Sequence, residues 1–197
     1  MIETARLDPL RCALFVITAF VIAGVLQTIW LQSTISRRLA VPLDAGLMFR
    51  GRRVFGENKT LRGLAVMVPG AAVIFYMLGS MLETGRSSWS GIWMLGPEQL
   101  AVVGAAAGVG FMVGELPNSF IKRQLGIGPG DAPRQSWARV VCFLGDRFDS
   151  ILGMLASLSL LVPTPWQMWV WVLLLGPAIH WSFSLLLFHL GVKGRPA

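Results

Sequence analysis

Long stretches without Asp, Glu, Lys or Arg make up most of this chain. They cover residues 13–35, 64–82, 99–114 and 150–192, and the last is broken by a Pro-Thr-Pro sequence at 163–165. A bilayer core of about 30 Å is crossed by about 20 apolar helical residues, and a proline inside a helix interrupts it. The pattern therefore predicts about five transmembrane helices, at approximately 12–35, 63–82, 98–117, 138–162 and 166–190.

The composition is that of a membrane protein. Hydrophobic residues make up 54% of the chain and charged residues 14%, and the mean hydropathy is +0.64. A soluble domain carries about 25% charged residues. The segments between predicted helices, 36–62 and 118–137, are too short for a separate soluble domain. We therefore expect an all-α, polytopic integral membrane protein in which residues 1–197 form a single transmembrane domain.

Positive charges are distributed unevenly along the chain. Of the 17 Lys and Arg residues, all but Arg6, Arg11 and Arg86 lie within 37–62, 122–147 and the C-terminal residues. Short segments rich in Lys and Arg stay in the cytoplasm. We expect a multi-pass protein of the inner (cytoplasmic) membrane, with its N-terminus outside and its C-terminus in the cytoplasm. The net charge of +7 belongs to these segments and does not indicate nucleic-acid binding.

Acidic residues near the predicted fourth helix are candidates for chemistry. Asp146 and Asp149 are three positions apart, so on a helix they project from nearly the same face and form a candidate site for one or two divalent cations. Glu115, at the end of the third predicted helix, would complete an acidic cluster if the third and fourth helices pack side by side. The alternative is an ordinary capping and salt-bridge arrangement around Arg147 at a helix start.

The loop before the second predicted helix mixes glycine with cationic and hydroxyl side chains, between Arg50 and Gly63. Glycine lets backbone N–H groups approach a phosphate, Lys and Arg donate charge-assisted hydrogen bonds, and Thr bonds an oxygen or a metal. The loop is therefore a candidate polyphosphate site, although its glycines do not form a Walker motif. The alternative is a topology signal with some affinity for anionic lipid.

Small residues recur at four-residue spacing in the third predicted helix, as Gly104-xxx-Gly108 and Gly110-xxx-Gly114. This spacing allows two helices to approach closely, and we expect it to serve packing rather than chemistry. Cys12 and Cys142 form no paired motif, so the sequence indicates neither a disulfide framework nor a zinc site.

Three motifs resemble signatures of the CDP-archaeol synthase family. Pro42-Leu43-Asp44 and the stretch 51–63 are similar to that family's cytoplasmic loop, in which Gly-Arg-Arg precedes Lys-Thr-x-Arg-Gly. Residues 119–126 look like its Ser-Phe-x-Lys-Arg-x-x-Gly signature. Residues 145–150 are similar to the Asp-Arg-x-Asp-Ser ending shared with phosphatidate cytidylyltransferases. The three motifs occur in the family's order, and five helices is also its architecture.

The resemblance implies a CTP-dependent cytidylyltransferase that converts a membrane lipid phosphate to a CDP-lipid and releases pyrophosphate, with Mg²⁺ as cofactor. It implies metal ligands at Asp146, Asp149 and Glu115. The implied catalytic residues are Asp146, Asp149, Lys122 and Arg123. The implied substrate-binding residues are Arg52, Arg53, Lys59, Thr60, Arg62 and Ser119. The family usually has Gly-Asp where this chain has Gly114-Glu115, which moves one carboxylate by a methylene group.

A non-catalytic lipid-binding or transport protein is the competing hypothesis. Transporters place ionisable groups near the middle of the membrane beside broken helices, whereas the charges of this chain gather at one predicted face. The expected partners are CTP and a lipid phosphate in the membrane, with no nucleic acid, and a homo-oligomer is compatible with the sequence. Nothing in the apolar stretches identifies the acceptor lipid.

Overall fold

The computed structural model is built from five long helices. It describes the whole chain except residues 1–6, 85–90, 132, 134 and 192–197. The long helices are α1 (Pro9–Gln32), α2 (Leu61–Thr84), α3 (Pro97–Gln124), α4 (Ser136–Ser159) and α5 (Trp166–His189). A 3₁₀ helix, η1 (Ile35–Leu39), and a hairpin of β1 (Met48–Phe49) and β2 (Arg52–Arg53) lie between α1 and α2. This architecture confirms the expected all-α polytopic fold.

Four of the five helices, α1, α2, α3 and α5, are long and apolar enough to cross a membrane. The exception is α4, which has the length of a span but carries Arg139, Asp146, Arg147 and Asp149. Its charges lie in its first two-thirds, while its last turns are apolar. The polar part of α4 is therefore the part that bears the predicted chemistry.

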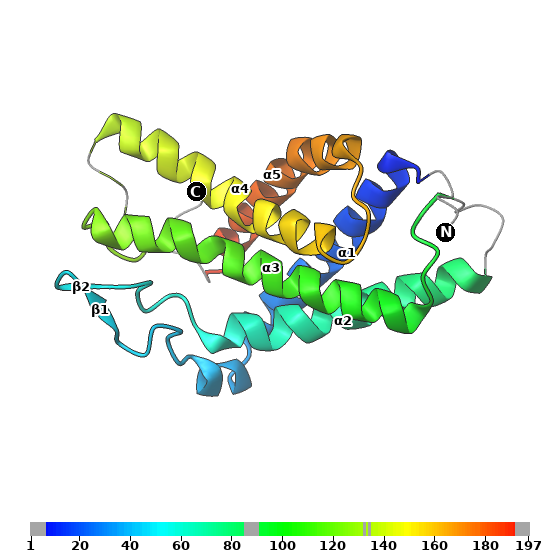
Figure 1. Cartoon of the computed structure of the whole chain (residues 1–197). Coiled ribbons are helices and arrows are strands. Elements are labelled where there is room, and N and C mark those ends of the chain that lie inside the picture. The colour runs from blue at the N-terminus through cyan, green and yellow to red at the C-terminus, as the bar shows by residue number, and fades with distance from the viewer. Residues whose placement is uncertain (1–6, 85–90, 132, 134, 192–197) are drawn as a thin grey trace.

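The helices pack around α3, which contacts both α2 and α4 along its length, while α1 packs against α2 and α5 (Figure 1). Buried aromatic rings fill the space between α1 and α2, with Phe15 and Phe75 edge to face at 5.1 Å between ring centroids. Such pairs add to the stability gained by burying the rings. Consecutive helices run in opposite directions, so the η1–hairpin segment and the α3–α4 connection meet at the same end (Figure 1).

Glycines bring α3 and α4 into backbone contact. A Cβ atom on Gly153 would lie 2.2 Å from the Gly110 carbonyl oxygen, and one on Gly114 would lie 2.5 Å from the Asp149 carbonyl oxygen. Gly104 and Gly108 approach α2 in the same way. The packing role predicted for these small residues is confirmed, and the α3–α4 contact lies directly beside the acidic residues of both helices.

The third helix is longer than predicted. It passes through Pro117 and ends at Gln124, so the predicted loop 118–137 is wrong over residues 118–124. Proline is tolerated inside transmembrane helices, where neighbouring groups take up the freed carbonyl. At 1.5 Å per residue, the 28 residues of α3 span about 42 Å, more than the apolar core of a bilayer. The helix is therefore longer than a bilayer core requires, and the turn that carries Lys122 and Arg123 remains helical.

The hairpin between α1 and α2 was not predicted. Met48 pairs with Arg53 and Phe49 with Arg52, and the intervening Arg50 and Gly51 both have positive φ, at 51° and 75°. Left-handed conformation at both central residues is the signature of the turn that matches strand twist in two-residue hairpins.

Five residues counted in the charge pattern lie outside the described part of the chain: Arg6, Arg86, Arg134, Lys193 and Arg195.

Candidate active site

The loop between η1 and α2, residues 40–60, is organised around a buried carboxylate. The side chain of Asp44 is 0% exposed and forms an ion pair with Arg53. Its oxygens also accept hydrogen bonds from the backbone N–H groups of Gly46, Phe55 and Gly56, at 2.9 to 3.1 Å. A carboxylate that accepts several bonds within one loop fixes that loop's backbone. We call this group the Asp44 centre.

These contacts keep Asp44 ionised. Burial alone would raise the pKa of Asp44, but the hydrogen bonds from Arg53 and from the three backbone N–H groups outweigh burial. The pKa of Asp44 is held well below its ordinary value of 3.8. The Asp44 centre is therefore an internal ion pair at neutral pH.

Basic residues join this loop to the end of α3. Arg123 donates from Nε to the Phe55 carbonyl at 3.3 Å and also bonds the Ile127 carbonyl. Gly56 lies against the same guanidinium, because a Cβ there would be 2.9 Å from the Arg123 Nε. Arg52 donates to the Gln124 carbonyl. The loop and the last turn of α3 therefore form one surface.

A row of polar side chains crosses from α3 to α4. Asn118 donates from its Nδ2 atom to Asp146 Oδ1 at 2.7 Å and to Asp149 Oδ2 at 2.9 Å. Lys122, one turn further along α3, forms an ion pair with Asp146. The Asp146 side chain is 48% exposed, so this row is open to solvent at one end. Asp146 and Asp149 do project from one face of α4, as their spacing predicted, and we call them the acidic pair.

The row continues inward to Glu115 and Lys59. Ser150 Oγ donates to Glu115 at 2.9 Å and lies 3.2 Å from Asp149 Oδ1. Glu115 forms an ion pair with Lys59, which comes from the end of the α1–α2 loop. Burial alone would lower the pKa of Lys59, but the charge and hydrogen bond of Glu115, with added attraction from the acidic pair, raise it. Lys59 is therefore an ammonium group beside the carboxylates.

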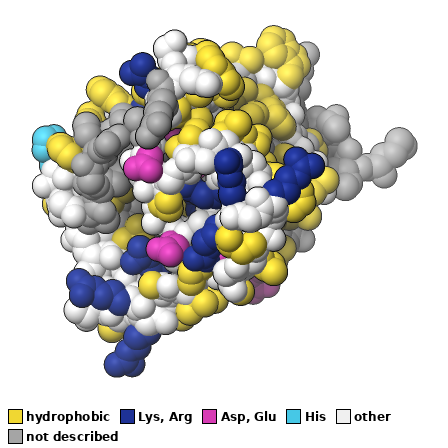
Figure 2. Space-filling model, turned by 90° about the vertical axis from the view of Figure 1, so that its left-hand side faces the viewer, with side chains coloured by type: hydrophobic (Ala, Val, Ile, Leu, Met, Phe, Trp, Pro, Cys, Tyr) yellow, Lys and Arg dark blue, Asp and Glu magenta, His cyan; other side chains and the backbone are white. Residues whose placement is uncertain are grey.

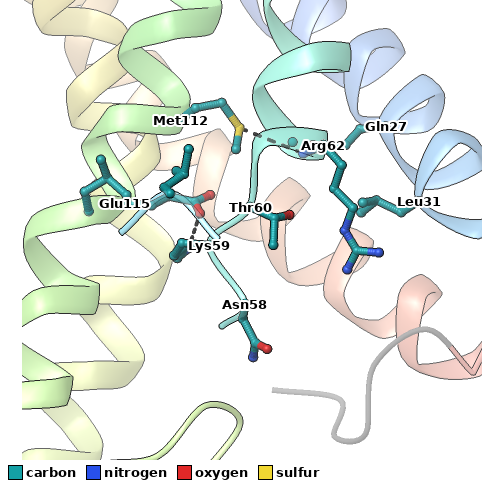
Figure 3. Close-up of a pocket in the computed structure, with 11 residues that line it drawn as sticks. Gln27, Leu31, Asn58, Lys59, Thr60, Arg62, Met112 and Glu115 are labelled. Carbon is teal, nitrogen blue, oxygen red and sulfur yellow. Dashed lines mark hydrogen bonds and ion pairs between the residues drawn. The ribbon is translucent and has the colours of Figure 1, made fainter. Parts of the chain in front are cut away.

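A small pocket opens on the other side of Lys59. It has a volume of about 140 Å³ and lies between the end of α1, the start of α2 and the middle of α3 (Figure 3). Polar groups of Gln27, Asn58, Thr60 and Arg62 share its wall with apolar groups of Leu31 and Met112. Figure 3 shows Lys59 and Glu115 on one side of this pocket and Arg62 beside Leu31 on the other.

Viewed from the end that carries the loop, the molecule shows many Lys and Arg side chains around a few acidic ones (Figure 2). Two anionic substrates bound at one site repel each other, so cations must offset their charge. The row provides such cations, because a lysine lies at each end, Lys122 beside Asp146 and Lys59 beside Glu115.

The donor set of the acidic pair fits Mg²⁺. Mg²⁺ takes oxygen ligands, keeps several waters and is often held by one or two carboxylates together with substrate phosphates. Asp146 Oδ1 and Asp149 Oδ2 both lie within hydrogen-bond distance of a single nitrogen, so the two carboxylates converge and would hold the ion together. Within the described residues, no three His, Cys, Asp or Glu side chains are grouped closely enough to hold a metal by themselves. Glu115 is separated from the acidic pair by Ser150 and engaged by Lys59, so its predicted role as a ligand is untested.

The structure gathers most of the predicted site residues, but in two groups. Lys122, Asp146, Asp149, Glu115 and Lys59 form the row described above. Thr60 and Arg62 line the pocket. The remaining members, Arg52, Arg53 and Arg123, make contacts inside the protein, and Ser119 is buried in α3 at 6% exposure.

Sequence reasoning missed Asn118, Ser150 and the role of Asp44. The signal for Asn118 was present, because positions 115, 118 and 122 follow the three- and four-residue spacing of one helix face. Because the third helix was predicted to end at residue 117, Asn118 fell in the predicted loop and was not counted on this helix face. Asp44 gave no such signal, since its partners are backbone N–H groups that only the folded loop brings together.

Comparisons with known proteins agree with this geometry. Residues 21–196 match the family model described as CarS-like, CDP-archaeol synthase. A CDP-archaeol synthase of Methanoculleus marisnigri is 29% identical over 164 residues, covering 79% of this chain and 89% of the relative. That of Halobacterium salinarum is 30% identical over 162 residues, covering 79% and 82%. That of Thermofilum pendens is 29% identical over 189 residues, covering 94% and 80%.

A solved structure, described as an intramembrane enzyme for archaeal membrane lipids biosynthesis, has the same fold. It matches with a TM-score of 0.58 and 25% identity, covering 95% of this chain and 96% of the other. The match extends over all five long helices, and the family model spans the loop, the row and the pocket. This chain belongs to the CDP-archaeol synthase family.

Proposed function

We propose that this chain transfers the cytidylyl group of CTP to a membrane lipid phosphate, and that Asp146 and Asp149 hold the Mg²⁺ this reaction uses. The observation that carries the proposal is the row from Lys122 to Lys59, in which lysines flank acidic side chains of two adjacent helices. Membership of the family supports the reaction class. The competing non-catalytic function has no support in the fold or in the relatives.

The reaction joins two anions. An oxygen of the lipid phosphate attacks the α-phosphorus of CTP, the bond from that phosphorus to the bridging oxygen breaks, and pyrophosphate leaves with the bond electrons. When bound, Mg²⁺ would bring the triphosphate to the acidic pair and offset its charge. Lys122 lies beside Asp146. Its ammonium group would bond the departing pyrophosphate once those phosphates displace Asp146 from it.

Lys59 lies where the two substrates would meet. It contacts Glu115 on the side of the acidic pair and also lines the pocket with Thr60 and Arg62. The pocket, at about 140 Å³, is smaller than the roughly 300–1,000 Å³ of sites that enclose drug-sized ligands. It suits the phosphate of the acceptor better than a whole nucleotide, and Leu31 and Met112 provide the apolar wall that a lipid requires.

The proposed orientation places this end of the molecule in the cytoplasm, where CTP is available. The segments that contain η1, the hairpin and the end of α3 are rich in Lys and Arg, and such segments are retained inside. The N-terminus of α1 then faces the outside of the inner membrane, and the acceptor reaches the pocket from the surrounding lipid.

The test is a transfer assay with purified protein, labelled CTP, Mg²⁺ and a panel of acceptors that includes phosphatidate, an archaeal-type ether lipid phosphate and polyprenyl phosphates. We expect a labelled CDP-lipid from at least one acceptor, together with one equivalent of pyrophosphate. Arg62→Ala is expected to raise the KM for the acceptor more than that for CTP, because Arg62 lines the pocket.

Folded protein that forms no CDP-lipid from any acceptor, while binding labelled lipid, would favour the lipid-binding alternative. Loss of acceptor and CTP affinity to the same extent in Arg62→Ala would contradict the division into two substrate regions while leaving the transfer reaction intact.

A further inference from the structure

A single neutral amide joins the acidic pair. The Nδ2 atom of Asn118 has two N–H bonds, and the structure uses one for Asp146 and one for Asp149, at 2.7 and 2.9 Å. An amide nitrogen has no further donors. The amide therefore bridges two carboxylate oxygens from the adjacent helix, which is also what a small cation would do at this point.

The amide is closely packed. A Cβ on Gly145 would lie 3.0 Å from Asn118 Oδ1 and 3.2 Å from its Nδ2, so a larger residue at 145 would press against this side chain. Lys122 is nearby but contacts Asp146 rather than both aspartates. The geometry thus assigns the bridging position to a group without charge.

The lack of charge matters for an ion that must enter. Lys122 already offsets the charge of Asp146. A lysine at position 118 would add a second positive charge that competes with a cation, whereas an amide satisfies the oxygens and adds no charge. Without any donor there, two carboxylates that face one nitrogen position would repel each other.

We propose that Asn118 is a positioning residue that takes the place of the cation in the metal-free protein and yields the bridging position to the ion when it binds. This inference rests on the proposed function, because it concerns the same Mg²⁺ site. It assigns to Asn118 a role in cation affinity that is separate from contact with CTP or lipid.

The test replaces the amide by a carboxylate. Asn118→Asp puts a third negative charge against the pair, so the metal-free protein should melt at a lower temperature and Mn²⁺, read by its electron paramagnetic resonance signal without CTP or lipid, should bind about tenfold more tightly. Asn58→Asp is the matched control, because it adds the same charge in the loop beside the pocket. It should change Mn²⁺ affinity by less than about twofold.

A second variant covers the case in which Asn118→Asp does not fold. Asn118→Ala should lower the melting temperature of the metal-free protein, and saturating Mg²⁺ should restore most of that loss, because the ion then bridges the aspartates itself. A purely structural asparagine would give the same loss of melting temperature with and without Mg²⁺.

Three results have distinct meanings. Equal Mn²⁺ affinity in Asn118→Asp and Asn58→Asp, or an Mg²⁺-independent loss in Asn118→Ala, overturns the inference alone. No saturable Mn²⁺ binding to the wild-type protein overturns the inference and the metal part of the proposed function. Because the readout contains neither CTP nor lipid, failure of the transfer reaction leaves this result unaffected.

Discussion

The two carboxylate groups at this end of the molecule are built in opposite ways. The Asp44 centre is closed: its carboxylate is fully buried and accepts bonds from Arg53 and three backbone N–H groups of its own loop. The acidic pair is open: Asp146 is 48% exposed, and both aspartates share the amide of one asparagine.

The Asp44 centre is suited to holding its loop together, and the acidic pair is suited to binding a ligand. A carboxylate whose acceptors are filled by the chain itself cannot bind a ligand without breaking the loop, so Asp44 is suited to structure. A carboxylate held mainly by side chains of a neighbouring helix can exchange those partners for a metal or a phosphate at less cost. Counting acidic residues in a motif does not distinguish the two, but their hydrogen-bond partners do.

The largest expected effect comes from the open group. Asp146→Asn and Asp149→Asn should each reduce kcat by about 100-fold or more, since a metal offsets transition-state charge by several kcal/mol. The melting temperature of Asp146→Asn should stay near that of wild type, because one amide oxygen still accepts the bond that Asn118 donates. That of Asp149→Asn should fall by a few degrees, because Asp149 accepts the Asn118 and Ser150 bonds on two different oxygens and an amide has only one. Turnover of labelled CTP and thermal melting measure both quantities.

Glu57→Gln is the matched control for this loss. Its carboxylate lies at the same end of the molecule, is 75% exposed and pairs with the guanidinium of Arg53. Activity close to wild type is expected. Wild-type turnover in either aspartate variant would remove the acidic pair from the metal site.

The closed group should show the reverse pattern. Asp44→Asn leaves the Arg53 charge without its buried partner, and breaking a buried pair lowers the free energy of unfolding by about 3 kcal/mol. Activity should fall less than in Asp146→Asn, and the loss should grow with temperature, because the loop that carries Lys59 becomes less ordered. Chemical denaturation and assays at two temperatures test this.

Here again Glu57→Gln provides the comparison, since it removes the other carboxylate bonded to Arg53. Its stability should stay near wild type because that pair is exposed. If Asp44→Asn lost activity as completely as Asp146→Asn while remaining fully stable, the distinction between the two groups would fail.

The smallest effect is a difference in acid stability. Asp44 has a folded-state pKa below its ordinary value of 3.8, so its contribution to stability is complete above about pH 3.8 and is lost as the pH falls below it. The stability gap between wild type and Asp44→Asn should therefore narrow in acid. A gap that widened there would mean that Asp44 is not an ion-pair partner in the folded protein.

Hydrophobic patterning predicted the helices well because the bilayer imposes one length on every span. The predicted span 166–190 and the observed α5, Trp166–His189, nearly coincide. The error at the end of α3 arose where that constraint stops, since five of the seven residues 118–124 are polar or charged and α3 is longer than an apolar core of about 30 Å requires. There, helical structure depends on contacts with α4 and the loop rather than on hydropathy.

The site was predictable to the extent that its residues lie on regular helices. The shared face of Asp146 and Asp149 followed from their spacing. The engagement of Arg53 by Asp44, and of Arg123 by the Phe55 carbonyl, depends on how an irregular loop folds back on α3. Spacing rules do not describe such loops, so the sequence predicted substrate binding for Arg53 and catalysis for Arg123 without showing that both also hold the loop in place.

The contact of α3 with α4 through glycine also bears on membrane thickness. Where Gly110 and Gly114 meet Gly153, the backbones of the two helices are in direct contact. When a bilayer becomes thicker or thinner, helices respond mainly by tilting, and these two must tilt together. We therefore expect the spacing between Asn118 and the aspartates to change little when lipid composition changes, including changes caused by the products of lipid synthesis.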